Sequence, residues 1–152
     1  MEITIKQKLE AKLPDWAIKT HPTKPKLSVI HPMAVIERLN DVFGVGAWSF
    51  TTEFIKCEKA IQKTKNGDRD VFESLVKGRL EVPVYNIVLE QYGGSTNDDM
   101  GDATKGGGTD ALTKIASYLG IGAEIYKGNG NITPGEKIAP KITNTEDFDQ
   151  PF

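Results

Sequence analysis

Two long segments in the middle of the chain alternate between apolar and polar side chains. The first segment places one alternating set on one face: Trp48, Phe50, Thr52 and Phe54. The second does the same with Phe72, Ser74, Val76, Gly78, Leu80 and Val82. A period of two is typical of a half-buried β-strand, and the KNGDRD stretch at 65–70 between them contains Asn-Gly, a strong hairpin signal. The sequence therefore predicts a long antiparallel hairpin.

The hairpin is followed by a proline, Pro83, which cannot donate a hydrogen bond to a neighbouring strand. We expect a kink or bulge there and a third strand over residues 84–92. The next polar stretch, STNDDMGD at 95–102, is predicted to be a loop. These elements predict an α+β fold in which an antiparallel three-stranded sheet packs with helices.

A glycine-rich segment at 101–128 contains apolar residues at the helical period. Those residues are Leu112, Ile115, Ala116 and Leu119. We predict a helix from about Thr109, as N-cap, to Leu119, with Gly120 at its C-terminus. The positions between the apolar ones are expected to face outward: Asp110, Lys114 and Ser117.

The N-terminal third of the chain predicts two further helices. Residues 2–13 have apolar residues at four-residue steps, and Pro32 can begin a helix that Gly44 ends. Residues 16–27 contain two prolines and three lysines, which indicates an extended, exposed connection.

Composition limits the functional classes. The 152 residues suit one domain, the single Cys57 excludes an internal disulfide, and two histidines, each before a proline, give no zinc spacing. No apolar run is long enough to span a membrane, and we expect a cytoplasmic protein. The net charge is -2. Residues 141–152 hold three acids against one base, so residues 1–140 are neutral and a basic surface must be local.

Three features together resemble a known family: HPMAVIERLNDVFGVGAWSF at 31–50, the antiparallel strands that follow, and KGGGTDALTKIASYLGIGAEIY at 105–126. They are similar to the single-strand annealing recombinases of the Rad-fifty-two superfamily, particularly the short phage and prophage members. The resemblance implies a β-β-β-α core that assembles into homo-oligomeric rings or filaments. It also implies ATP-independent annealing of complementary single-stranded DNA in recombination and repair, with no cofactor, no metal and no enzymatic reaction, in a bacterial cytoplasm at the nucleoid.

In that family a basic groove holds the sugar-phosphate backbone with the bases outward, which leaves them free to pair. Carried onto this chain, the resemblance implies the following DNA-binding residues: Lys24, Lys26, Lys56, Arg69, Lys77, Arg79, Lys105 and Lys114. Thr113 and Ser117 stand where eukaryotic members carry bases, which implies fewer backbone contacts.

Several alternatives remain open from the sequence. Gly106–Gly108 either belong to a loop that ends at Thr109 or lie in a longer helix that DNA or a neighbouring subunit approaches closely. No lysine follows the glycines at the spacing of a nucleotide-binding P-loop, so ATP binding by that motif is rejected. A strand-coating or end-protecting module without annealing would share these features. A metal-dependent nuclease would use three acids that otherwise form a solvated turn: Asp98, Asp99 and Asp102.

The last residues predict a separate element. Residues 128–152 are rich in Gly, Pro, Asn and Thr and are expected to be a flexible tail after a domain at 1–127. Their end, DFDQPF, resembles the acidic tip of bacterial single-stranded-DNA-binding proteins. That resemblance implies contacts with host replication or repair proteins by five residues: Asp147, Phe148, Asp149, Pro151 and Phe152.

Overall fold

A computed structural model describes residues 1–21, 24 and 26–127. These residues fall into two compact units, which are described separately. The sheet unit is Ala47–Ile115, and the N-terminal unit is Met1–Gly46 with residues 116–127. The predicted tail at 128–152 lies outside the described residues.

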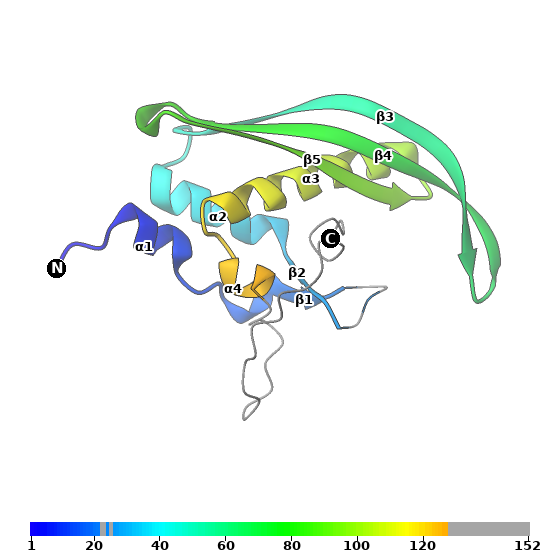
Figure 1. Ribbon diagram of the computed structural model, residues 1–152, viewed down its shortest axis with the longest axis horizontal. Coiled ribbons are helices and arrows are strands. Elements are labelled where there is room, and N and C mark those ends of the chain that lie inside the picture. Colours follow the sequence, from blue (N-terminus) through cyan, green and yellow to red (C-terminus); the bar gives the residue numbers. More distant parts are fainter. Residues whose placement is uncertain (22–23, 25, 128–152) are drawn as a thin grey trace. The chain divides into compact units, whose positions relative to one another are not determined.

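The sheet unit is a three-stranded antiparallel sheet of order β3-β4-β5 packed against a helix (Figure 1). Its strands are β3 (Ser49–Thr64), β4 (Gly67–Val82) and β5 (Ile87–Asn97). Both the predicted hairpin and the predicted α+β class are confirmed, because β3 and β4 pair along their lengths from Ser49↔Glu81 to Thr64↔Gly67. The register shifts once, between Phe54 and Lys56.

The connection from β4 to β5 differs from the prediction. Pro83–Tyr85 form a 3-10 turn and Asn86 adopts a left-handed conformation with φ 52°, so that Val82 pairs with Ile87. Pro83 therefore begins a reversal of the chain instead of a kink within a strand. The predicted third strand at 84–92 is wrong at both ends, because the turn occupies its start and β5 continues to Asn97.

Helix α3 (Met100–Tyr118) begins nine residues before the predicted start at Thr109, so the loop predicted over 95–102 is also wrong. The Asp99 carboxylate accepts a hydrogen bond of 2.9 Å from the Asp102 N–H, which is the geometry of an N-cap. The proposed N-cap, Thr109, lies inside the helix and donates its hydroxyl to the Lys105 carbonyl at 3.0 Å.

Glycines in α3 and in the strands bring helix and sheet into backbone contact. A β-carbon on Gly93 of β5 would overlap the Gly107 carbonyl oxygen and the Ala111 backbone. One on Gly107 would lie 2.9 Å from the Val76 side chain. Each helical glycine costs about 1 kcal/mol relative to alanine. The sheet of the same chain therefore approaches this helix closely, which gives the glycines a structural reason.

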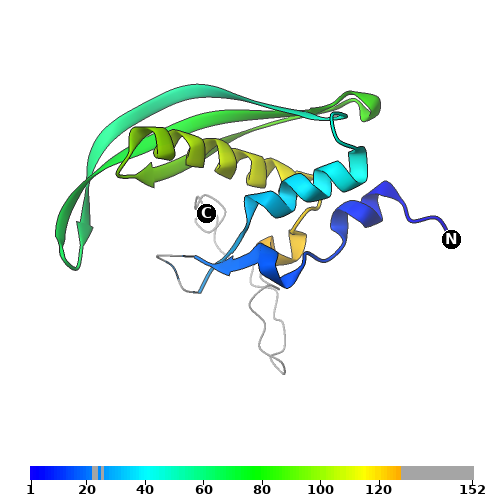
Figure 2. The same ribbon diagram turned by 180° about the vertical axis from the view of Figure 1, so that it is seen from behind.

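The two views agree that α3 runs along one face of the three strands (Figure 1 and Figure 2). The alternating set predicted for β4 is confirmed from Ser74 to Val82, but it is wrong at its start, because Phe72 is only half-buried and its neighbour Val71 is buried. The apolar core of this unit consists of eight side chains: Val71, Val76, Leu80, Val82, Ala103, Ala111, Leu112 and Ile115.

The described residues of the N-terminal unit form three α-helices, one 3-10 helix and a two-stranded sheet. Its elements are α1 (Ile5–Glu10), η1 (Asp15–Ala17), β1 (Ile18–Thr20), β2 (Ser28–Ile30), α2 (Pro32–Phe43) and α4 (Ala123–Tyr126). The limits predicted for α2 are confirmed, whereas α1 is shorter than predicted and begins after a capping box of Thr4 and Gln7. The connection predicted at 16–27 is wrong in part, since it contains η1 and β1, and β1 pairs with β2.

Arg38 of α2 forms hydrogen bonds to backbone carbonyls at the C-terminal end of α1. Its Nη1 donates to the Leu9 and Ala11 carbonyls at 2.9 and 2.7 Å, where the helix leaves carbonyls without intrahelical partners. This arginine therefore has a structural role.

Within the part of the chain that the structure describes, no helix is both long and apolar enough to span a bilayer.

Candidate nucleic-acid interface

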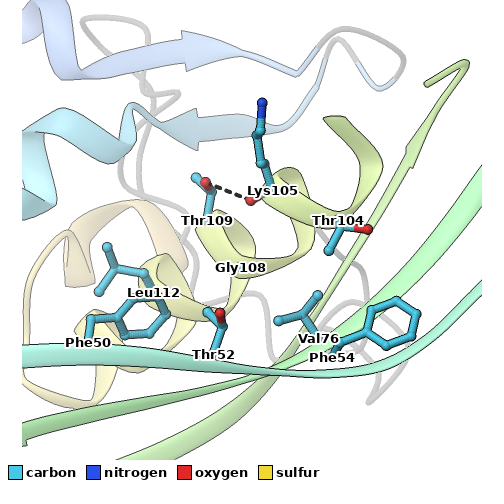
Figure 3. A pocket seen from close by; sticks show the side chains of 9 residues that line it. All are labelled: Phe50, Thr52, Phe54, Val76, Thr104, Lys105, Gly108, Thr109 and Leu112. Atoms are coloured by element: carbon cyan, nitrogen blue, oxygen red, sulfur yellow. Dashed lines mark hydrogen bonds between the residues drawn. The ribbon is translucent and has the colours of Figure 1, made fainter. Parts of the chain in front are cut away.

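A groove of about 370 Å³ lies between the edge strand β3 and helix α3 (Figure 3). Nine residues line it: Phe50, Thr52, Phe54, Val76, Thr104, Lys105, Gly108, Thr109 and Leu112. The strand contributes alternate side chains because residues two apart point to the same face. The helix contributes residues three, four and five positions apart, which form one side of the helix.

The groove has an apolar wall and a single charged residue among those that line it, Lys105. The Lys105 side chain is 82% exposed, and its ammonium is 3.8 Å from the Asp102 carboxylate. An exposed pair at that distance holds its partners weakly, so the ammonium can reach an anion. Phe54 is 59% exposed, more than expected for a core position, because β3 is an edge strand.

The two bases predicted on β4 lie on the opposite face of the sheet. Ser74, Val76 and Leu80 point toward α3, so Lys77 and Arg79, at odd positions, point away from it. The structure therefore does not bring them together with Lys105. Lys77 and Arg79 lie on the face of the sheet that α3 leaves uncovered, which we call the open face.

Acidic residues neutralise both strand bases. The Lys77 ammonium lies 3.1 Å from the Glu90 carboxylate, and the Arg79 guanidinium lies 2.8 Å from Glu90 and also contacts Glu81. Hydrogen bonding to Glu90 raises the pKa of Lys77, and hydrogen bonding to Arg79 and then Lys77 lowers the pKa of Glu90. The basic side chains of this face are therefore paired with its acidic side chains.

Lys114 is tied to a buried acid. Its ammonium lies 3.1 Å from the Asp110 carboxylate, which also accepts a hydrogen bond of 2.9 Å from the Gly94 N–H of β5. Asp110 was expected to face outward and is instead 5% exposed, because the helix begins earlier and rests on the strand glycines. Lys114 itself keeps 22% of its side chain exposed.

The four remaining predicted bases lie elsewhere. Lys56 pairs with Glu58 at 2.9 Å, and Arg69 donates to Gln62 across the hairpin at 2.8 Å. Lys24 and Lys26 belong to the connection between β1 and β2 in the N-terminal unit. These residues are not part of the β3–α3 groove.

A comparison with protein families matches residues 2–138 to the Rad52/22 family double-strand break repair protein. This match covers far more than half of the 152 residues. The chain belongs to the Rad52/22 family. A search of curated proteins finds none that matches. Membership confirms the superfamily named from the sequence, while the phage type and the resemblance of the tail tip stay predictions.

Two of the three acids considered for a nuclease have other roles in this Rad52/22 family member. Asp99 caps α3 and Asp102 pairs weakly with Lys105. Among residues 1–21, 24 and 26–127, no three His, Cys, Asp or Glu side chains are grouped to hold a metal ion.

Sequence reasoning identified Lys105 but missed the groove beside it. Two signals could have indicated the groove. Asp99 followed by a helix-compatible run predicts an early N-cap, and the glycines at 93 and 106–108 suit a helix laid closely on a strand. Together they extend α3 along β3, where Phe54 lies.

Proposed function

We propose that this Rad52/22 family chain binds single-stranded DNA and anneals complementary strands without ATP. The observation that supports the proposal most is the family match over residues 2–138, since that family is one of double-strand break repair. Residues 1–127 would form the annealing and oligomerisation domain. The chain would act as a homo-oligomer in the cytoplasm.

We place the first DNA contact at Lys105. Lys105 is among the residues that line the β3–α3 groove, its exposed side chain extends from α3 away from β3 (Figure 3), and no acidic residue lines that groove. A lysine in such a position screens phosphate charge without reading the base sequence, as annealing requires. Lys114 is a second, separate contact: it lies on the opposite side of α3 from Lys105, beside β5, where Asp110 holds its orientation.

We propose that the other predicted bases contribute less to DNA binding than Lys105. Lys77 and Arg79 would have to exchange closely held Glu90 and Glu81 for phosphate, whereas Lys105 gives up only a longer, more exposed pair with Asp102. The resemblance-derived contacts at Lys24, Lys26, Lys56 and Arg69 would extend the DNA path if the oligomer aligns them.

The test is strand annealing with two complementary labelled oligonucleotides and no added ATP. We expect the wild-type chain to accelerate annealing and the Lys105→Ala chain to do so weakly. Lys63→Ala is the matched control, because Lys63 is an exposed lysine of β3 outside the groove. Strand binding without acceleration would instead identify a coating module, and equal activity of Lys105→Ala and wild type would refute the assignment of Lys105.

We also propose that the tip residues Asp147, Phe148, Asp149, Pro151 and Phe152 bind host replication or repair proteins. The support is their composition, since acidic and aromatic side chains together suit basic, apolar pockets. Replacing Pro151 and Phe152 by alanine should abolish pull-down of such proteins and leave annealing intact. Unchanged pull-down would contradict this proposal.

A further inference from the structure

The two edges of the sheet differ in how their peptide groups are occupied. On β5, the N–H of Tyr92 donates to the Gln91 side chain and the N–H of Gly94 donates to Asp110, both at 2.9 Å. These two positions, separated by one residue, have N–H groups turned to the same edge. Side chains therefore close the middle of the β5 edge to another strand.

The β3 edge beside the groove has no such protection. Among the hydrogen bonds of the described residues, none joins a side chain to the peptide groups of Ser49–Phe54. An edge strand with open peptide groups can pair with an added extended segment. Phe50 and Phe54 alternate along this edge and line the groove, so every second side chain of an added segment would enter it.

The groove is suited to a segment that is both aromatic and acidic. Its wall offers Phe50, Phe54, Val76 and Leu112, and its one charged lining residue is a lysine. An aromatic ring placed there is removed from water, and the Lys105 ammonium, which extends from α3 away from β3 (Figure 3), can meet a carboxylate that stays outside the groove.

The chain itself carries a segment of this composition. DFDQPF at 147–152 combines two phenylalanines with two aspartates. Residues 128–146 separate it from the last described residue and can extend to about 60 Å, several times the ~13 Å radius of gyration of a domain of 100 residues. Attachment to the same chain also gives the segment a local concentration in the millimolar range.

We infer that the Asp147–Phe152 segment docks in the β3–α3 groove of its own chain and competes there with single-stranded DNA. Phe148 and Phe152 enter the apolar wall, and the aspartates neutralise Lys105. This inference rests on the proposed function for its consequence: DNA must displace the segment, and displacement exposes the tip to other proteins. The groove acts as a self-regulated site.

Photocrosslinking of the full chain tests the docking directly. A benzoylphenylalanine placed at position 148 should crosslink to residues of β3 or α3 that line the groove, with excess single-stranded oligonucleotide suppressing the product. Mixing light and ¹⁵N-labelled chains distinguishes the source, because docking within one chain gives products of a single isotopic form. Mixed-isotope products, or crosslinks only outside the groove, would overturn the inference.

DNA affinity supplies the second readout. In the full chain, Phe148→Ala with Phe152→Ala should tighten single-strand binding roughly tenfold, if the local concentration is about 1 mM and the segment's own dissociation constant about 0.1 mM. Phe54→Ala should lower the groove crosslink, whereas Ile61→Ala, another exposed apolar residue of β3, should not.

The two hypotheses fail differently. A chain that crosslinks in the groove but binds no single-stranded DNA would contradict the proposed function and keep the docking. A chain that binds DNA with the same affinity with and without Phe148 and Phe152, and shows no groove crosslink, would contradict the docking alone.

Discussion

The two faces of the β3-β4-β5 sheet carry bases under opposite conditions. On the covered face, α3 presents Lys105 at a groove with no acidic lining residue. On the open face, Lys77 and Arg79 share Glu90 and Glu81. The open face has more bases, but their charge is less available to a phosphate than that of Lys105. A basic residue on an exposed strand is therefore weak support for DNA binding until its neighbours across the strands are known.

The faces also differ in how closely they are packed. On the covered face, glycines bring two backbones together, and a single added carbon has no space. On the open face, the same addition meets only ordinary contacts. The covered face thus determines stability and shapes the groove, while the open face is tolerant. The following predictions test this contrast, from the largest effect to the smallest.

Neighbouring glycines of β5 should respond very differently to alanine. Gly93→Ala should destabilise the fold by about 3 kcal/mol or more, because the new carbon would overlap the α3 backbone. Gly94→Ala should change stability by less than about 0.5 kcal/mol, since its nearest neighbour would be the Ser74 carbonyl oxygen at 3.7 Å. Chemical denaturation measures both, and equal losses would contradict the asymmetry.

Removing the buried acid should be the next largest effect. Asp110→Ala should cost about 2 kcal/mol, because it leaves the Gly94 N–H and the Lys114 ammonium without this carboxylate. Glu58→Ala is the matched control, as it removes an exposed partner of Lys56 and should cost under about 0.5 kcal/mol. Thermal unfolding of both variants checks the difference; similar shifts would mean that burial of Asp110 carries no extra weight.

The two faces should also separate in the salt dependence of DNA binding. Lys105→Ala should reduce the slope of log affinity against log salt by about 0.7, the value for one phosphate contact on a single strand. Lys77→Ala should leave the slope nearly unchanged, because Glu90 already offsets that charge. A fluorescence titration over a range of salt measures both. A larger loss for Lys77→Ala would place the DNA on the open face.

The smallest effect concerns pH. The pKa of Glu90 is lowered in the folded chain by hydrogen bonds to Arg79 and Lys77. Its contribution to stability is thus complete above the ordinary value of 4.5 and is lost as the pH falls through the lower folded value. Glu90→Gln should flatten the acid side of the stability curve slightly, since the group is exposed. Identical curves for wild type and Glu90→Gln would show that the network adds nothing.

Local patterns predicted much of the secondary structure. The alternation on both sides of Asn66 predicted the β3–β4 hairpin, and Pro32 and Gly44 predicted the limits of α2. The start of α3 was wrong, because helix propensity disfavours three glycines and the sheet that compensates for them is distant in sequence. Lys105 could be named as a base, but its place beside Phe54 could not.

The sequence by itself determined the α+β class, the hairpin, most of the buried face of β4, and the superfamily resemblance that the Rad52/22 match confirms; the set predicted to be buried on β3 is instead half-buried at Phe50 and exposed at Thr52 and Phe54. Only the tertiary structure decided which bases keep an available charge. Lys77 of β4 forms an ion pair with Glu90 of the neighbouring strand β5, and Lys114 forms one with Asp110, which is buried beside β5. Alternation assigns a side chain to a face. Its electrostatic partners depend on strand register and helix position, which are properties of the folded chain.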